Sequence, residues 1–329
     1  MVQQQRIQLQ AEVLPEHDGE RLDIIAAAVF PQYSRSRLQQ WIKSGALQVD
    51  GVQLKTREKL HQGQQLLLDV LLEVESEQNA GEDIPLDIVY EDDSILVLNK
   101  PAGLVVHPAA GNARGTLMNA LLFHYPELAH VPRAGIVHRL DKDTTGLMVV
   151  AKTLEAHHSL VSQLQERSVS RQYYALVQGV ITAGGSIDAP IGRHPNNRQK
   201  QAVVEFGGKE AVTHYRVEER FRAHTLVRCQ LETGRTHQIR VHMAHIHFPL
   251  LGDKLYAGRP KLPKAASLEL IEALQQFPRQ ALHAFKLGLL HPEDGEYCEW
   301  EIELADDIAA LLPLLRQDLR EHGRDNPLR

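Results

Sequence analysis

A polar segment with residue types suited to acid–base or nucleophilic chemistry separates two apolar runs near the middle of the chain. The runs at residues 135–137 and 146–151 are typical of buried strands, and Asp141 lies between them with Arg139 and Lys142 beside it. A charged carboxylate is unfavourable inside a buried strand. We therefore predict that Asp141 lies on a turn at the rim of a sheet, where a pocket can form.

Asp141 could act as a nucleophile or as a general base, because a positively charged neighbour favours the ionised carboxylate. Asp143 lies only two positions away, which is poor geometry for the two separated carboxylates of a glycosidase. The segment 143–146 is similar to an aspartic protease motif, but the chain holds no second copy with which to share a proton. The alternative without chemistry is a surface ion pair between Asp141 and Arg139.

The sequence indicates neither a nucleotide cofactor nor a metal. It contains no G-x-x-x-x-G-K-[ST] motif and no G-x-G-x-x-G motif after a strand. Histidines 237, 242, 245 and 247 are crowded together, but they lack the H-E-x-x-H spacing and have no acid or cysteine among them. We interpret them as packing or helix-surface residues and expect no metal and no cofactor.

The composition is that of a chain with a sizeable core. Its 329 residues are 43% hydrophobic, which is enough for more than one domain. The two cysteines, Cys229 and Cys298, do not make a disulfide framework. We see no targeting segment and no apolar run long enough to span a bilayer. These features predict a cytoplasmic protein with no membrane partner.

Charge is segregated along the chain, although the formal net charge is only -6. Residues 73–93 hold nine acids and no Lys or Arg, whereas residues 34–59 hold six bases against two acids. Residues 193–240 hold ten bases against five acids. Phosphate binding depends on local fields, so the basic segments are compatible with a nucleic-acid partner. Their alternative is an ordinary solvated surface.

The sequence pattern predicts a small α+β unit over residues 5–72. Ser34 is a suitable N-cap for a helix that ends before Gly45, and Leu38 and Ile42 share its apolar face. A strand of alternating pattern follows over residues 46–52 and runs into an Asp-Gly turn at 50–51. A closing strand is predicted over residues 66–72.

Residues 73–83 have the composition of an acidic linker, and a second unit is predicted over 84–329. Most of its segments look like strands, which indicates an α+β fold. The predicted elements are a hairpin turning at 91–94, a helix capped by Thr153 with apolar positions Leu154, Leu160, Val161 and Leu164, a strand at 173–179, paired strands within 213–232 and a helix at 236–244.

Several ordered motifs resemble those of the RNA pseudouridine synthases that modify large-subunit ribosomal RNA and some transfer RNAs. The motifs are His138-Arg139-Leu140-Asp141 with Thr144-Thr145-Gly146, Arg171-Gln172-Tyr173-Tyr174-Ala175-Leu176-Val177, the segment from Leu231 to His242, and the opening hairpin from Asn99 to Pro108. The first unit resembles the S-four RNA-binding domain through Gly19 to Asp23, Ser34-Arg35-Ser36 and Gly45.

The resemblance implies a catalytic domain with a mixed, mostly antiparallel sheet and a central cleft. It also assigns roles to individual residues. Asp141 is then the catalytic carboxylate, which either attacks the ribose C1′ or removes the C2′ proton. Arg139 fills the space that an extruded base leaves, and Tyr173 packs against the uracil. Pseudouridine formation gains or loses no electron or group, so the resemblance implies no cofactor.

Motif position within the resemblance favours Arg235 as the cation that holds Asp141 charged. Arg240 is the competing candidate and otherwise a phosphate contact. Arg240 lies five positions on in the expected helix, a rotation of about 500° that points it away from residue 235. In the first unit, Arg35, Arg37 and Lys43 are expected to contact phosphates.

The implied partner is large-subunit ribosomal RNA or one of its assembly intermediates, bound by a monomer that uses no nucleotide cofactor. A different class of function remains possible on the same fold. A non-catalytic RNA-binding or ribosome-assembly protein would retain the basic segments and would bind RNA without modifying it.

Overall fold

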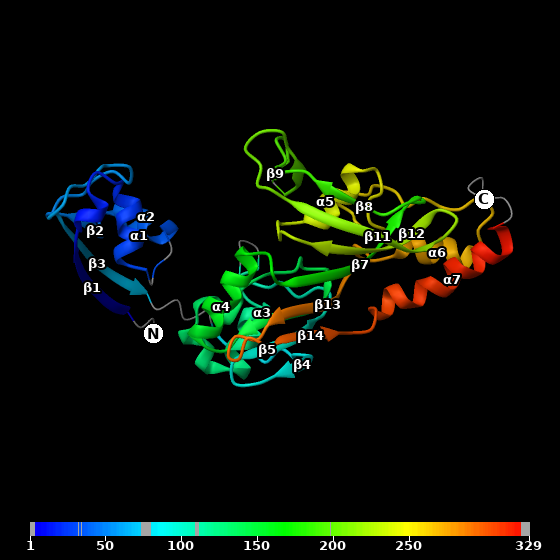
Figure 1. Cartoon of the computed structure of the whole chain (residues 1–329), viewed down its shortest axis with the longest axis horizontal. Coiled ribbons are helices and arrows are strands. Elements are labelled where there is room, and N and C mark those ends of the chain that lie inside the picture. The colour runs from blue at the N-terminus through cyan, green and yellow to red at the C-terminus, as the bar shows by residue number, and fades with distance from the viewer. Residues whose placement is uncertain are drawn as a thin grey trace. The chain divides into compact units, whose positions relative to one another are not determined.

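The computed structural model describes residues 4–31, 33, 35–73, 80–108, 112–197 and 199–323. The chain divides between residues 79 and 80 into two compact units (Figure 1), each with its own hydrophobic core. In the part of the chain that the structure describes, no helix is both long and apolar enough to cross a membrane.

The first unit is a small α+β fold. Its described strands form an antiparallel sheet in the order β1-β3-β2, and both α-helices contribute to one core with this sheet. The elements are β1 (Gln4–Glu12), η1 (Pro15–His17), α1 (Leu22–Val29), α2 (Arg35–Ser44), β2 (Leu47–Val49) and β3 (Gln65–Glu73).

Local sequence accounts for the middle of this unit. Leu38 and Ile42 are fully buried on one face of α2, as predicted. Gly45 follows the helix with φ +79°, and Asp50 and Gly51 have φ 51° and 78°, the left-handed conformations that glycine-containing caps and hairpin turns require. The predicted N-cap, Ser34, lies outside the described residues.

The second unit confirms the predicted α+β fold with a mostly antiparallel sheet. Its elements are β4 (Ile88–Glu91), β5 (Ile95–Lys100), α3 (Leu117–His124), η2 (Pro126–His130), η3 (Pro132–Gly135), β6 (Thr145–Ala151), α4 (Leu154–Gln165), β7 (Ser170–Gln178), β8 (Gly185–Asp188), β9 (Ile191–Arg193), β10 (Gln201–Val203), β11 (Val212–Arg220), β12 (His224–Leu231), α5 (Gln238–His245), α6 (Leu268–Gln276), β13 (Leu282–Leu290), β14 (Tyr297–Glu301) and α7 (Asp306–His322).

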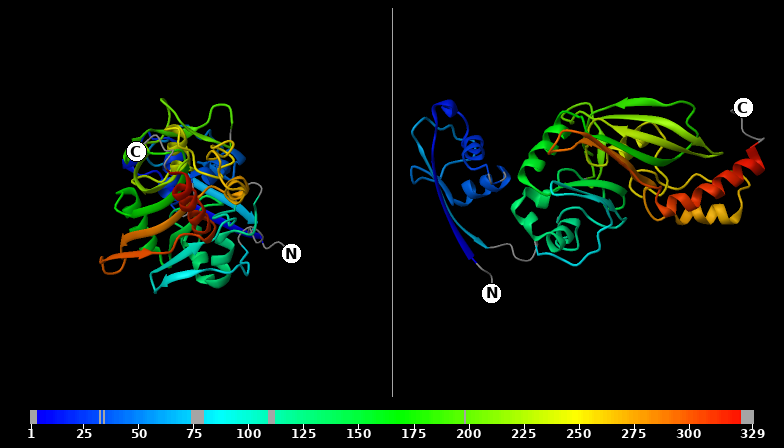
Figure 2. Two further views of the ribbon diagram at one scale, coloured as in Figure 1. Left: turned by 90° about the vertical axis from the view of Figure 1, so that its right-hand side faces the viewer. Right: turned by 60° about the horizontal axis from the view of Figure 1, so that its bottom comes forward.

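Within the described residues, nine strands make one sheet in the order β4-β5-β6-β13-β7-β12-β11-β8, with β14 added to β13. Figure 2 shows this sheet from two further directions. Only the β6–β13 pair among these is parallel. Gly146 pairs with Ala284 in this ladder and has φ +114°, and a Cβ there would lie 2.2 Å from the Ala284 carbonyl oxygen. The strand that follows the Asp141 segment therefore depends on glycine for its close approach to β13.

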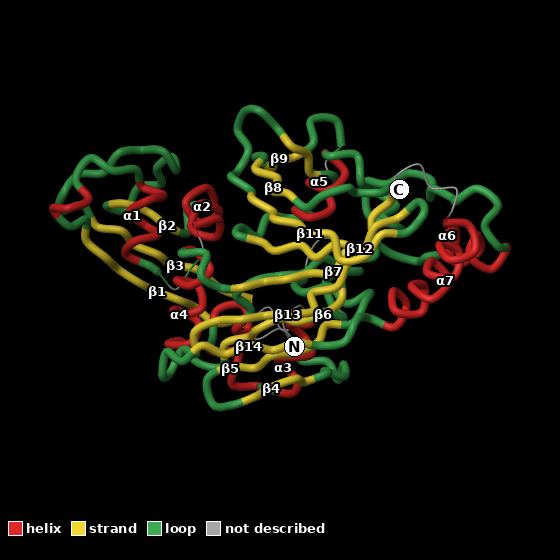
Figure 3. The backbone as a smooth tube through the Cα atoms, turned by 45° about the vertical axis from the view of Figure 1, so that its right-hand side comes forward, coloured by secondary structure: helices red, strands yellow, loops and turns green. Residues whose placement is uncertain are grey.

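The centre of the sheet is buried on both faces. Along β6, Met148 and Val150 enter one core with residues of α3 and α5, and Leu147 and Val149 enter another with residues of α4. A third core joins the sheet to α6 and α7, which lie beside each other in Figure 3. Strands buried on both faces form a rigid support for the segment between Ile136 and Thr145.

Three local predictions were wrong. The apolar run at 135–137 is not a strand: η3 precedes it and Ile136 makes only an isolated bridge to Val150. Gly135, at φ +76°, lies so close to β6 that a Cβ would approach the Ala151 carbonyl oxygen to 1.9 Å. The backbone is left-handed at Arg133, Ala134 and Gly135, which is incompatible with an extended strand there.

The helix predicted from residue 236 begins instead at Gln238, because His237 has φ 59° and cannot continue a right-handed helix. The N-cap role of Thr153 is confirmed, since its side chain accepts a hydrogen bond from Ala156 N. Leu154, predicted on the apolar face of that helix, is 47% exposed because it occupies the first helical position.

Residues 80–83, which the composition assigns to the acidic linker, contact α3. The Asn119 side chain donates to Ala80 O at 2.9 Å, and Glu82 N donates to Asn119 O at 3.0 Å. Residues 74–79 of the predicted linker lie outside the described residues.

Because each unit has its own core, we expect residues 80–329 to fold without the first unit. Urea unfolding of this fragment, followed by far-ultraviolet circular dichroism, should show one cooperative transition. It should match the transition of the same region in the full-length chain. A fragment that unfolds without cooperativity would show that the second core needs the first unit.

Candidate active site

A cavity of about 550 Å³ opens in the second unit beside Asp141. Its walls come from the segment after η3, from β7, and from the segment that joins β12 to α5. The polar lining residues include Arg139, Asp141, Arg167, Arg171, Tyr173, Glu232, Arg235, His237 and Arg240. The predicted site residues of the second unit therefore share one cavity.

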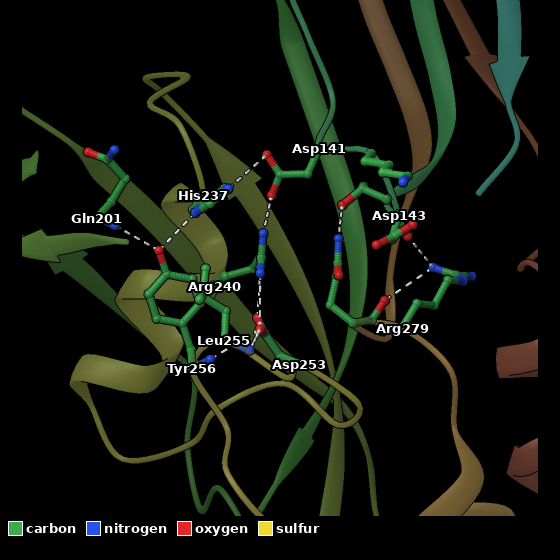
Figure 4. Close-up of polar contacts among 12 residues, drawn as sticks. Asp141, Asp143, Gln201, His237, Arg240, Asp253, Leu255, Tyr256 and Arg279 are labelled. Carbon is green, nitrogen blue, oxygen red and sulfur yellow. Dashed lines mark hydrogen bonds and ion pairs between the residues drawn. The ribbon is translucent and has the colours of Figure 1, made fainter. Parts of the chain in front are cut away.

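The Asp141 carboxylate is held by Arg240. Arg240 Nη1 donates to Asp141 Oδ2 at 2.8 Å, and the Asp141 side chain is 15% exposed. The same guanidinium donates Nε and Nη2 to the two oxygens of Asp253, at 2.7 and 3.0 Å. One buried arginine is therefore shared by two carboxylates, as Figure 4 shows.

Asp253 fixes the position of this arginine. Its side chain is fully buried, and Oδ1 also accepts the backbone N–H groups of Leu255 and Tyr256 at 3.0 and 3.2 Å. The Tyr256 ring lies beneath the guanidinium, 5.1 Å from its centroid to the Arg240 Cζ. Burial alone would lower the pKa of Arg240, but the hydrogen bond to Asp253 and the charge of Asp141 raise it above the ordinary value.

The structure corrects the predicted partner of Asp141. Arg235 is exposed, and its Nε donates to the backbone oxygen of Glu210 at 2.9 Å. The expected divergence of the two side chains assumed that a helix includes residue 235. The helix starts at Gln238, so the direction of Arg235 cannot be derived from helical rotation relative to Arg240. Arg240 occupies the first turn of α5 and faces the cavity.

The alternative role expected for Arg240, a phosphate contact, is also inconsistent with its surroundings. The residue is 7% exposed, and both edges of its guanidinium are occupied by carboxylates. A guanidinium engaged in this way offers no free pair of donors to a phosphate.

His237 approaches the other oxygen of Asp141. Its Nε2 lies 3.9 Å from Asp141 Oδ1, and its Nδ1 lies 2.8 Å from Tyr256 Oη. Tyr256 Oη accepts Gln201 N at 2.9 Å, so its proton is available to His237 Nδ1. Burial lowers the pKa of His237. A neutral imidazole can accept the Tyr256 proton at Nδ1 and then carries its own proton on Nε2, which faces Asp141 Oδ1.

Tyr173 and Arg139 both line the cavity. Tyr173 is 5% exposed, lines the cavity, and has its pKa raised by burial. Tyr174 faces the other side of β7 and stacks on Phe285, with 3.9 Å between the ring centroids. Arg139 is exposed, and its guanidinium makes no hydrogen bond or ion pair within the described ranges.

A buried lysine binds the backbone next to Asp141. Lys100 is fully buried, and its Nζ donates to the backbone oxygens of Pro101, Leu104 and Lys142 at 2.7, 3.0 and 2.9 Å. Burial lowers the pKa of this amine to about 7, against the opposing charges of Asp143 and Asp141. The ammonium therefore ties the opening hairpin to the backbone next to Asp141.

An arginine holds the other end of the same turn. Arg279 Nη1 donates to Asp143 O at 3.0 Å, and its Nε and Nη2 pair with Asp307, both at 2.7 Å. Thr144 N donates to Asp141 O at 3.1 Å and closes the turn. The contacts to Asp143 and Thr144 use backbone atoms, so the turn is fixed without engaging the Asp141 carboxylate.

The basic residues predicted in the first unit differ in their contacts. Arg35 Nη2 pairs with Asp23 at 2.8 Å, and Asp23 is fully buried and also accepts from Gln39. The Arg37 guanidinium lies 5.3 Å from the Trp41 ring centroid, and Lys43 is exposed. Arg35 is thus partly neutralised, although half of its side chain remains exposed.

Across the described ranges, no group of three His, Cys, Asp or Glu side chains is arranged to hold a metal ion. His242, one of the four crowded histidines, is fully buried between Thr213 Oγ1 and the Ala189 carbonyl oxygen, at 2.9 Å from each. This is the packing role predicted for it.

Comparison with known proteins identifies family matches in both units. Residues 94–245 match the family model described as RNA pseudouridylate synthase, and residues 20–66 match the S4 (S-four) domain. "Ribosomal large subunit pseudouridine synthase D" of Pseudomonas aeruginosa is 64% identical over 95% of this chain and 97% of its own length. The protein of the same name from Haemophilus influenzae is 54% identical over 96% of this chain and 98% of its own.

A solved structure has the same fold. "Human RNA Pseudouridylate Synthase Domain Containing 4" aligns with a TM-score of 0.56 at 27% identity. The alignment covers 70% of this chain and 93% of the human one.

Sequence reasoning missed several residues of the site. Asp253 and Tyr256 have no motif of their own, and only the fold brings them to Arg240. The sequence pattern predicts only a packing or helix-surface role for His237, which in the structure lies beside Asp141. Arg171 could have been found, because strand alternation places it on the same face as Tyr173.

We expect Arg240→Met to be far more destabilising than Arg235→Met. Removing Arg240 leaves Asp253 buried without its cation, which costs about 3–5 kcal/mol. Arg235 is exposed, and its loss should change stability by about 0.5 kcal/mol or less. Urea unfolding of both variants measures this difference. A larger loss for Arg235→Met would contradict the assignment of Arg240 as the central cation.

Lys100→Met should change how stability depends on pH. In the folded chain the Lys100 pKa is about 7, against 10.5 for an unperturbed lysine. Between these values the unfolded chain binds more protons, so this group makes stability rise as pH increases from about 7 towards 10.

The comparison is therefore between urea unfolding of the wild-type chain and of Lys100→Met at several pH values in that range. The stability of the wild-type chain should rise relative to that of the variant. A constant difference would show that Lys100 titrates normally.

Proposed function

This chain belongs to the RNA pseudouridylate synthase family, and from that premise we propose that it isomerises specific uridines of large-subunit ribosomal RNA to pseudouridine. The relatives that match nearly its whole length carry that substrate in their names. The observation that carries the proposal is the Asp141 carboxylate in the cavity, with Oδ2 held 2.8 Å from Arg240 Nη1.

The proposed reaction needs one ionised carboxylate and balances without another reactant. The bond between uracil N1 and ribose C1′ breaks, the base turns, and C5 bonds to C1′ while N1 gains a proton and C5 loses one. Asp141 either attacks C1′ or removes the C2′ proton. A primary isotope effect with C2′-deuterated uridine identifies the second route, and its absence identifies the first.

The geometry supports Asp141 in either role. Arg240 stabilises the negative charge through one oxygen, and the hydrogen bonds that fix the turn use its backbone. In the described part of the chain no hydrogen bond reaches Oδ1, and His237 Nε2 lies 3.9 Å away, so this oxygen is available to the ribose. Tyr173 supplies a buried aromatic wall for the uracil.

Before it can react, the target base must leave the RNA stack. We propose that Arg139 occupies the vacated space, because it is exposed at the cavity and has no competing ion pair in the described part of the chain. We propose further that the enzyme acts on ribosomal RNA in the cytoplasm as a monomer, as expected from the sequence.

The first unit is proposed to supply affinity and placement. It matches the S4 domain over residues 20–66 and carries the basic helix with Arg35, Arg37 and Lys43. The fragment 80–329 should therefore bind the RNA more weakly than the full chain, with a shallower dependence on salt. Equal affinity and equal salt dependence would refute this division of roles.

We expect wild-type protein to convert uridine to pseudouridine in an unmodified large-subunit ribosomal RNA transcript, whereas Asp141→Asn should reduce the rate by at least about 10⁴-fold. RNA affinity should stay within about threefold, because the side chain keeps its size. Single-turnover rates and filter binding measure the two quantities. A wild-type chain that binds this RNA and never modifies it would instead be a non-catalytic assembly protein.

A further inference from the structure

Arg171 is a buried cation in the wall of the cavity. It lies two positions before Tyr173 on β7, so both side chains project from the same face of the strand. Both line the cavity, and Arg171 is only 6% exposed. Neither the turn at Asp141 nor the Arg240 ion pair uses it.

The hydrogen bonds of this guanidinium are incomplete. Nη2 donates to Glu232 O at 3.2 Å, whereas the buried Nε has no partner. Nη1 has no partner either within the described residues and, unlike Nε, is not shielded from solvent. No carboxylate of the described chain forms an ion pair with Arg171, although buried charges are normally paired.

Two further arginines, Arg167 and Arg235, line the cavity on the same side as Arg171. Burial and the charge of Arg235 lower the pKa of Arg171. Arg167, also in the lining, is already paired with Glu210 and Glu232. The carboxylates nearby are therefore occupied by other cations, and this side of the cavity has an uncompensated positive charge.

The adjoining turn has space for the Arg171 side chain because residue 234 is glycine. A Cβ on Gly234 would lie 2.7 Å from Arg171 Nη1. The turn itself is rigid, since the buried Gln238 amide accepts from Thr233 Oγ1 and Arg235 N at 2.8 and 2.9 Å. The unpartnered Nη1 is thus presented next to backbone that does not compete for it.

We propose that Arg171 binds a backbone phosphate of the RNA next to the target uridine. The inference rests on the proposed function and adds a substrate-binding residue to it. A phosphodiester supplies the negative charge that the buried guanidinium lacks, and its oxygens match the arginine donors. A uracil carbonyl would accept a hydrogen bond from an N–H group but would leave the positive charge uncompensated. The backbone oxygen of Glu232 already has this effect.

Salt dependence of binding tests the proposal without requiring turnover. Loss of one phosphate contact should reduce the slope of log affinity against log salt by about 0.7 in Arg171→Gln. RNA affinity at low salt should fall about tenfold. Filter binding of the large-subunit ribosomal RNA transcript measures both quantities.

Arg316→Gln is the matched control, because it also removes one positive charge. Arg316 lies on α7, pairs with Glu219, and does not line the cavity. Its slope and affinity should remain those of the wild-type chain. Arg171→Lys keeps the charge and loses the planar fork, so its slope should be retained while its affinity falls.

A modified RNA locates the phosphate. Neutral methylphosphonate is placed singly at the linkage on either side of the target uridine. At one of the two positions it should weaken wild-type binding about tenfold, with little further effect in Arg171→Gln. If Arg171→Gln does not fold, the penalty should shrink in Arg171→Lys.

An unchanged salt slope in Arg171→Gln would overturn the proposal, even if stability falls, because Arg171 would then only tie β7 to the Glu232 backbone. Equal methylphosphonate penalties in wild type and variant would do the same. If wild-type protein binds the transcript without isomerising it, the proposed function fails while the slope still tests Arg171. If isomerisation proceeds and the slopes match, only the Arg171 proposal fails.

Discussion

The guanidinium of Arg240, shared between Asp141 and Asp253, is the interaction on which the site depends. A cation at 7% exposure would be unstable alone, and Asp253, with its backbone donors from Leu255 and Tyr256, fixes it in place. The pair that Asp253 and Arg240 form is neutral. Asp141 therefore adds one net negative charge to the cluster, beside a donor that stabilises it.

The remaining polar contacts hold the backbone around Asp141 and leave its carboxylate accessible. Lys100 binds the Lys142 carbonyl from one side, and Arg279 binds the Asp143 carbonyl from the other. The glycine at position 146 then lets β6 meet β13 in parallel. A reactive group on a turn is precise only when such contacts and a rigid sheet restrain the turn.

The cavity carries opposite charges on two walls. Asp141, Asp253 and Arg240 form an ion cluster with one net negative charge, whereas Arg171 has no anionic partner among the described side chains. An RNA substrate brings a neutral base and a charged backbone, which suits a cavity with an aromatic wall at Tyr173 and a cationic wall nearby. The division of charge within one cavity thus follows the chemistry of a nucleotide.

From local periodicity, turn chemistry and ordered motifs, the sequence predicted the class of fold, the hairpin before Asp141, the strand after it and part of the cavity lining. It could not determine which arginine meets Asp141. That depended on the left-handed backbone at His237, so that α5 begins at Gln238, on Asp253 in the segment after α5, and on the approach of Asp141, which is 99 positions from Arg240. Pairing across such separations is decided by packing of the whole unit, since local sequence carries no information about which buried charges become neighbours.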